Sequence, residues 1–144
     1  MKKFELTSET KINIFGKKLF RIKALISFAD VEAGETGGWV EKEGNVNQSG
    51  NAWVYGDAMV YGDAKVYGDA MVSGDADYTT IHGFGTQFRT TTFFRCKDKK
   101  VRVACGCFFG TIPEFREQVK NTRKGKIAEE YLMIADLMEN HFEK

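Results

Sequence analysis

The stretch AWVYGDAMVYGDAKVYGDAMVSGDAD, residues 52–77, repeats one six-residue pattern, V-x-G-D-A-x, four times. Glycine recurs at every sixth position from Gly38 to Gly74, so the series begins before the obvious repeats. A six-residue period matches neither the 3.6-residue period of a helix nor the two-residue period of a strand. It is typical of a short strand followed by a sharp corner, because Gly, Asp and Asn tolerate positive φ. The sequence therefore predicts a stack of short β-walls.

The residues between the corners predict which side chains point inward. In the later repeats an alanine follows each valine by four residues. In the earlier, less regular repeats, Val40 and Val46 occupy the position that the alanine has in the later ones. We expect these small side chains to stack in a narrow interior, with each hexapeptide as one wall of a triangular prism. Seven hexapeptides give about two and a third coils, and such a short stack must be capped at both ends.

The pattern VYGDAM–VYGDAK–VYGDAM–VSGDAD resembles the hexapeptide repeat of left-handed parallel β-helices. The handedness is implied by this resemblance alone, because parallel crossovers are otherwise almost always right-handed. Upstream, LTSETKI and LFRIKALISFADVEAGETGGWVEKEGNV are similar to the opening of small, mostly uncharacterised hexapeptide-repeat proteins of bacteria and prophages. The resemblance covers about residues 5–77 and implies a fold and a genomic setting.

The flanking segments follow other patterns. Residues 11–25 alternate apolar and polar side chains around a Gly-Lys-Lys turn, which predicts a β-hairpin that caps the first coil. Further on, β-rich runs at 86–96 and 101–109 predict a second hairpin. Thr111 and Glu114 form a T-x-x-E capping box, with Pro113 in the first turn of a helix. We expect that helix to end near Asn121, and a second helix to follow at about 126–142.

These patterns predict a mainly β chain with three segments. They are an N-terminal hairpin cap (1–35), a hexapeptide-repeat β-helix (36–80) and a C-terminal module of a β-hairpin and two helices (81–144).

Composition indicates a soluble globular chain of 144 residues, 42% of them hydrophobic. No apolar run approaches the roughly 18 residues of a membrane-spanning helix, and the N-terminus has no signal-peptide pattern. We therefore expect no membrane partner. Three cysteines without a secretory signal favour reduced thiols in the cytoplasm.

One set of residues predicts a binding face. If Cys96 pairs with Val101, arginines and aromatic side chains share one face of the C-terminal hairpin: Arg89, Phe93, Arg95, Arg102 and Phe108. Guanidinium groups bind phosphates and aromatic rings stack on bases, so a nucleotide or nucleic acid could bind there. The alternative is an amphipathic hairpin whose Phe93 and Phe108 pack under a helix.

Outward positions of the repeat predict a second surface, formed by Trp53, Tyr55, Met59, Tyr61, Tyr67 and Met71. Exposed apolar surface of this kind marks protein interfaces, here with a second copy of the chain, as a dimer or trimer, or with a host protein. The alternative is that the C-terminal helices fold back over these side chains.

Other titratable residues receive structural explanations. Cys96, Cys105 and Cys107 lack the paired C-x-x-C spacing of zinc sites, even with His82 or His141 as a fourth ligand, so we expect no metal and no cofactor. The corner aspartates are explained by their turns: Asp57, Asp63, Asp69 and Asp75.

The sequence therefore favours a non-enzymatic binding or interaction protein. The resemblance adds a phage or prophage accessory role, in which the chain binds or inhibits a host protein or binds a nucleotide or nucleic acid. The first alternative is a minimal acyltransferase that uses CoA, with His82 as general base. The second is a structural module that assembles with itself.

Overall fold

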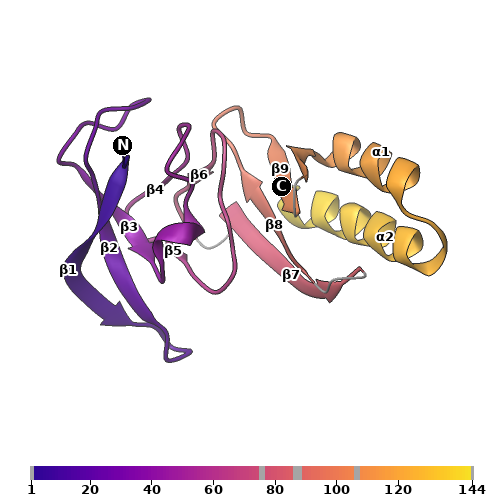
Figure 1. Cartoon of the computed structure of the whole chain (residues 1–144), viewed down its shortest axis with the longest axis horizontal. Helices are drawn as coiled ribbons and strands as arrows, with labels where there is room; N and C mark the ends of the chain where they lie inside the picture. The colour runs from indigo at the N-terminus through magenta and orange to yellow at the C-terminus, as the bar shows by residue number, and fades with distance from the viewer. Residues whose placement is uncertain (1, 75–76, 86–88, 106–107, 144) are drawn as a thin grey trace.

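The computed structural model describes residues 2–74, 77–85, 89–105 and 108–143. The strands are β1 (Phe4–Ile12), β2 (Lys18–Ala24), β3 (Thr36–Val40), β4 (Trp53–Val54), β5 (Met59–Val60), β6 (Met71–Val72), β7 (Tyr78–Phe84), β8 (Arg89–Arg95), β9 (Val101–Cys105) and β10 (Phe108–Thr111). The helices are a 3-10 turn η1 (Glu43–Asn45), α1 (Ile112–Thr122) and α2 (Gly125–Phe142). The chain is mainly β with two C-terminal helices, as predicted. Figure 1 shows the layers in chain order: N-terminal sheet, repeat, C-terminal sheet, helices.

The N-terminal hairpin is present and is joined to the repeat. β1 and β2 pair antiparallel up to Ile12 and Lys18, on either side of the predicted turn. β2 pairs antiparallel with β3, and β3 pairs parallel with β5 of the repeat. The resulting sheet has the order β1-β2-β3-β5, so the hairpin extends a sheet that the repeat begins.

Within the repeat, short parallel strands pair with strands that lie three six-residue repeats further along the chain, as the period predicts. Trp53 lies opposite Met71, and Val54 lies opposite Val72. At the corners, four glycines have positive φ: Gly50, Gly56, Gly62 and Gly68. The side chains predicted to point inward are buried in one core: Val46, Ala52, Val54, Ala58, Val60, Ala64, Val66, Ala70 and Val72. Local turn chemistry and side-chain size therefore position this part of the chain.

The predicted phase of the first repeats is wrong. Val40 pairs with Val60, and Val46 pairs with Val66. Both early valines therefore stack on later valines, whereas the sequence predicted that they would stack on alanines. Val46 and Val54 are eight residues apart, whereas later valines are six apart, so two extra residues lie between the early and late repeats. As a consequence, Gly38 is not a positive-φ corner. Its missing side chain instead makes room for a neighbouring backbone, because a Cβ there would lie 2.6 Å from the Ala58 carbonyl oxygen.

The C-terminal module contains a four-stranded antiparallel sheet, of order β10-β9-β8-β7, in place of the predicted hairpin. β7 follows the repeat and pairs with β8, and the predicted run 101–109 contains both β9 and β10. The two helices agree with the prediction. The Thr111 hydroxyl accepts a hydrogen bond from the Glu114 backbone N–H, and the Glu114 carboxylate accepts one from the Thr111 N–H at 2.8 Å.

Adjacent residues of β8 belong to two different cores. Phe94 faces the repeat and joins its core, together with Cys96 and Ala104. Phe93 faces the opposite side and packs with Val103 and the helices. A bridge between Ala70 and Cys96 links the repeat to the sheet. The C-terminal sheet therefore covers the repeat, and the helices cover the outer face of their own sheet (Figure 1).

A buried lysine connects the N-terminal segment to the repeat. Lys3 is 1% exposed, and its ammonium donates a hydrogen bond of 2.7 Å to the Ala52 carbonyl oxygen. The ammonium also lies 4.7 Å from the ring centroid of Phe28. Among the described residues it has no carboxylate partner. Burial without a counter-charge lowers the pKa of Lys3 from 10.5 to about 8.

This burial predicts a pH dependence of stability. The folded state holds the Lys3 proton less tightly than the unfolded state does, so the free energy of unfolding should rise as the pH increases from 8 to 10.5. The gain should reach up to about 3 kcal/mol. Urea unfolding at several pH values should show this rise in the native chain and lose it in Lys3→Met. The exposed Lys2→Met serves as the control, and parallel curves for the native chain and Lys3→Met would contradict the prediction.

Candidate functional site

The predicted arginine–aromatic face is divided between the two faces of the C-terminal sheet. Arg95 pairs with Val101 and Phe94 with Arg102, so the register differs by one residue from the predicted one. A shift of one residue exchanges the faces of a strand. Phe93 and Arg95 therefore lie on the helix side, and Arg102 lies on the repeat side. The Arg89 backbone belongs to β8, and its side chain lies outside the description.

The arginines of this predicted site already have acidic partners. Arg95 Nε lies 3.1 Å from Asp77 Oδ1, and its guanidinium lies over the ring of Phe142. Arg102 makes two hydrogen bonds of 3.0 Å to the Asp98 carboxylate, which lower the pKa of Asp98 to about 2. Phe93 is fully buried and packs against Phe115. The alternative prediction, a hairpin that packs under a helix, is confirmed for Phe93.

Most of the predicted interface on the repeat is covered by the chain itself. Trp53 is fully buried between the rings of Phe4 and Phe28, so its predicted exposure is wrong. The cause is the N-terminal segment, which lies over this wall.

The other members of that surface are half-buried. The Tyr55 hydroxyl donates a hydrogen bond to Asp30, and burial together with this bond raises the pKa of Tyr55 to about 12. The remaining four residues are Met59, Tyr61, Tyr67 and Met71. Tyr61 lies near Phe15 of the hairpin, and Tyr67 lies near Phe109 of β10.

The remaining candidates are dispersed. Exposed His82 lies on β7, with Nδ1 2.8 Å from Thr90 Oγ1. Cys96 is buried, and burial raises the pKa of its thiol. In the described part of the chain, no group of three potential metal ligands occurs. Cys107 and Asp75 lie outside the described residues.

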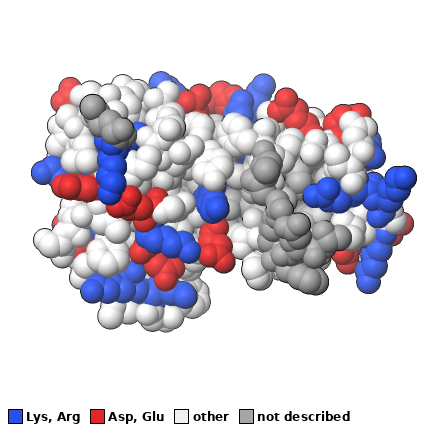
Figure 2. Space-filling view, viewed as in Figure 1, with Lys and Arg blue, Asp and Glu red and all other residues white. Residues whose placement is uncertain are grey.

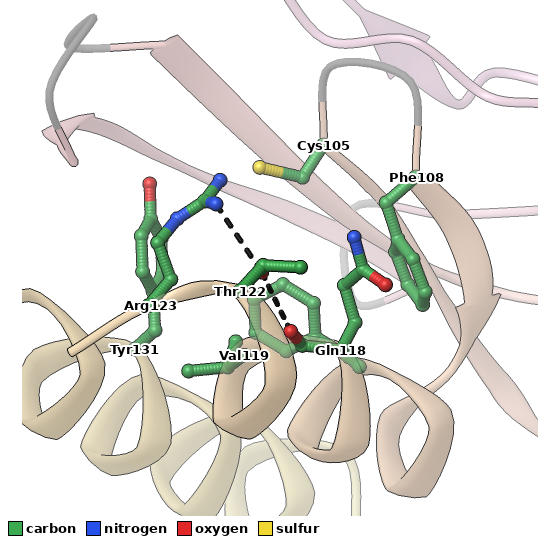
Figure 3. Close-up of a pocket in the computed structure, with 8 residues that line it drawn as sticks. Cys105, Phe108, Gln118, Val119, Thr122, Arg123 and Tyr131 are labelled. Carbon is green, nitrogen blue, oxygen red and sulfur yellow. Dashed lines mark hydrogen bonds between the residues drawn. The ribbon is translucent and has the colours of Figure 1, made fainter.

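A pocket of about 150 Å³ lies between the C-terminal sheet and the end of α1. Its lining residues are Cys105, Phe108, Phe115, Gln118, Val119, Thr122, Arg123 and Tyr131. Figure 3 shows Cys105 and Phe108 on the sheet side, with Gln118, Thr122 and Arg123 on the helix side. The pocket thus combines apolar walls with amide, hydroxyl and guanidinium groups.

Aromatic rings form the apolar part of the pocket. The ring centroid of Phe115 lies 5.6 Å from that of Phe108 and 5.8 Å from that of Tyr131. Tyr131 also approaches the backbone just after β7, because a Cβ on Gly85 would lie 2.5 Å from its phenolic oxygen. These contacts join α1, α2 and the sheet, so the pocket depends on tertiary packing.

Arg123 gives the pocket its charge. Its Nη1 donates a hydrogen bond of 3.3 Å to Thr122 Oγ1, and the Thr122 hydroxyl donates to the Gln118 carbonyl oxygen at 2.6 Å. The guanidinium lies 6.0 Å from the Tyr131 ring centroid. Among arginines with described side chains, Arg123 alone lacks a carboxylate partner. Its charge is therefore available to a ligand.

Among the described residues of the predicted arginine–aromatic face, Phe108 lines this pocket, and so does Cys105, which was considered above as a metal ligand. The pocket residues Gln118, Thr122, Arg123 and Tyr131 were not predicted from the sequence as binding residues. One signal was present: residues 120–126, KNTRKGK, contain four basic side chains and no acidic one. Figure 2 shows Lys and Arg side chains gathered at the end of the molecule where α1 and α2 meet.

Comparison with models of known protein families gives no match, and comparison with curated proteins gives none either. Neither described helix combines the length and the apolar character needed to cross a bilayer.

Proposed function

We propose that this chain is a non-enzymatic binding protein that binds a nucleotide. The planar base of the nucleotide would occupy the pocket beneath α1. The observation that carries this proposal is the guanidinium of Arg123, which lies beside an aromatic pocket and has no carboxylate partner among the described residues. The other arginines of this chain with described side chains each have a carboxylate partner. A phosphate group would supply the missing partner.

The apolar walls suit a planar ring. Phe108 and Phe115 offer aromatic surface on which a base can stack, an interaction that contributes about 1–3 kcal/mol per base. The volume of about 150 Å³ suits a single ring system and excludes a whole nucleotide, so the sugar and phosphate would extend outward. Outward extension brings the phosphate toward Arg123 and the basic segment 120–126.

The polar groups suit recognition better than catalysis. The carboxamide of Gln118 points into the pocket (Figure 3) and can both donate to and accept from the edge of a base. Cys105, Thr122 and Tyr131 are the potential nucleophiles among the lining residues, and neither histidine nor carboxylate is among those residues. A cysteine nucleophile generally needs such a base for activation.

The resemblance of the repeat supports further parts of the proposal. We propose that residues 36–80 are a short left-handed β-helix of the hexapeptide-repeat kind, and that the chain is an accessory protein of a phage or prophage in the cytoplasm. The pairing of Trp53 with Met71, one predicted coil apart, supports the first part. Homo-oligomerisation, acyl transfer from CoA with His82 as base, and self-assembly stay predictions.

Calorimetric titration with nucleoside monophosphates tests the binding proposal. We expect Arg123→Gln to weaken binding about tenfold or more, because a charge-assisted hydrogen bond contributes about 1.5–3 kcal/mol. Phe108→Leu should weaken it by removing the stacking surface. Arg116→Gln is the matched control, since it removes the same charge from α1 at a side chain that is paired with Asp136 and Glu139.

Two outcomes would overturn the proposal. The first is that no nucleoside monophosphate binds the folded protein at millimolar concentration. The second is that Arg123→Gln and Arg116→Gln bind equally well, which would place the ligand elsewhere. An uncharged nucleoside should bind much more weakly than its monophosphate.

A further inference from the structure

A second, larger cleft lies between the repeat and the C-terminal sheet. It encloses about 400 Å³ and is lined by Asp63, Lys65, Tyr67, His82, Thr90, Thr92 and Ala104. The first three residues belong to the repeat and the last four to β7, β8 and β9. The cleft lies on the face of β8 that carries Thr92 and Phe94, opposite the face that carries Phe93 and packs beneath the helices. It is therefore separate from the pocket at Arg123.

Hydrogen bonds across the junction hold the two sides of this cleft. The backbone N–H of Lys65 donates to Thr92 Oγ1 at 3.1 Å, although Thr92 is only 1% exposed. Nearby, the Lys97 N–H donates to the Asp69 carbonyl oxygen at 3.0 Å. These two bonds join the repeat directly to the sheet. The cleft is thus a fixed feature of the fold.

The charges in the cleft favour an anion. Asp63 is already neutralised by Lys42, whose ammonium lies 3.0 Å from its carboxylate and lowers the pKa of Asp63. The ammonium of Lys65 has no carboxylate partner among the described residues. His82 adds a second nitrogen base at the same opening. Lys65 and His82 also contribute to lowering the pKa of Asp63, and both side chains can donate a hydrogen bond to an oxyanion.

The orientation of His82 suits this role. Its Nδ1 is engaged with Thr90 Oγ1 at 2.8 Å. When the Thr90 hydroxyl donates to Nδ1, the ring proton lies on Nε2, which can then donate to a ligand. Tyr67 and Asp63, which carry a hydroxyl and a carboxylate, are also among the lining residues. These groups can bind the hydroxyls of a small polyol.

We propose that this cleft binds a small phosphate ester of a polyol, with the phosphate at Lys65 and His82 and the polyol hydroxyls toward Asp63 and Tyr67. The site would give the chain a second ligand at the junction of its two parts. Its occupancy would tie the repeat more firmly to the sheet.

Proton–carbon NMR of the two histidine side chains tests this inference. Glycerol 3-phosphate should shift the Hε1 resonance of His82 with saturation and leave that of His141 on α2 unchanged. Lys65→Gln should raise the apparent Kd at least fivefold, while Lys97→Gln, at an exposed lysine outside the cleft, should leave it unchanged. Uncharged glycerol should produce no saturable shift.

Three results would overturn the inference: no shift at His82, equal shifts at both histidines, or an unchanged Kd in Lys65→Gln. The Arg123→Gln variant separates the two sites. It should weaken nucleotide binding about tenfold or more, while the glycerol 3-phosphate titration of His82 stays as in the native chain. If one ligand does not bind at its proposed site, the binding of the other ligand at the other site can therefore still be interpreted.

Discussion

Replacing Trp53 by alanine is expected to lower the free energy of unfolding by about 3–5 kcal/mol, which is a large part of the stability of a domain of this size. Trp53 is fully buried, with its ring centroid 5.9 Å from that of Phe4 and 5.3 Å from that of Phe28. Its removal would leave a cavity where the N-terminal segment meets the repeat. Urea unfolding followed by circular dichroism measures the loss.

Trp53→Phe is the matched variant. The buried indole N–H of Trp53 has no hydrogen-bond partner among the described residues, so phenylalanine loses packing but no hydrogen bond. We expect a smaller loss than for alanine, below about 2 kcal/mol. If Trp53 instead served an intermolecular interface, alanine would change the oligomeric state and leave the stability of the monomer nearly unchanged. Sedimentation of both variants distinguishes the two cases.

Gly38→Ala is expected to have the next largest effect, at the upper end of the roughly 1–3 kcal/mol of overpacking or beyond it. A Cβ at this position would lie 2.6 Å from the Ala58 carbonyl oxygen and 2.6 Å from Val54 Cγ1. The carbonyl belongs to the backbone of the repeat and cannot rotate away as a long side chain would. The Trp39 N–H donates to the same oxygen at 2.9 Å, so a shift would also break that hydrogen bond.

Gly44→Ala is the control for this prediction. Gly44 occupies the next position of the six-residue series, and a Cβ there would meet no atom within 4 Å. Its substitution should change the free energy of unfolding by no more than about 0.5 kcal/mol. Equal destabilisation by both alanines would contradict the close approach at Gly38, because a Cβ at Gly44 would meet no neighbouring atom.

The repeat was predictable because its demands are local. Each corner needs a residue that tolerates positive φ, and each interior position needs a small apolar side chain. The same reasoning placed Thr111 at the start of α1, since a capping box involves only four neighbouring residues. The first repeats were misread because glycine has two uses, and sequence does not separate a corner such as Gly56 from a close approach such as Gly38.

The binding residues were less predictable because they depend on register and on tertiary contact. The N–H of Cys96 donates to the Lys100 carbonyl oxygen, and Lys99 adopts φ of +69°. This turn places Val101 opposite Arg95, and composition alone does not decide between that register and its neighbour. Arg123 and Phe108 come together only through the packing of α1 on the sheet, which no spacing in the sequence encodes.

The shared strand β8 limits how this chain can be rearranged by recombination. Phe93 packs in the core beneath the helices, and Phe94 packs in the core of the repeat. Separating the repeat from the C-terminal sheet would therefore expose part of one of these cores. A gene fragment that encoded only the C-terminal sheet and helices would expose the apolar face that Phe94, Cys96 and Ala104 form. Such a fragment would need a new covering surface in its recipient. The repeat and the module behind it are therefore expected to be inherited together.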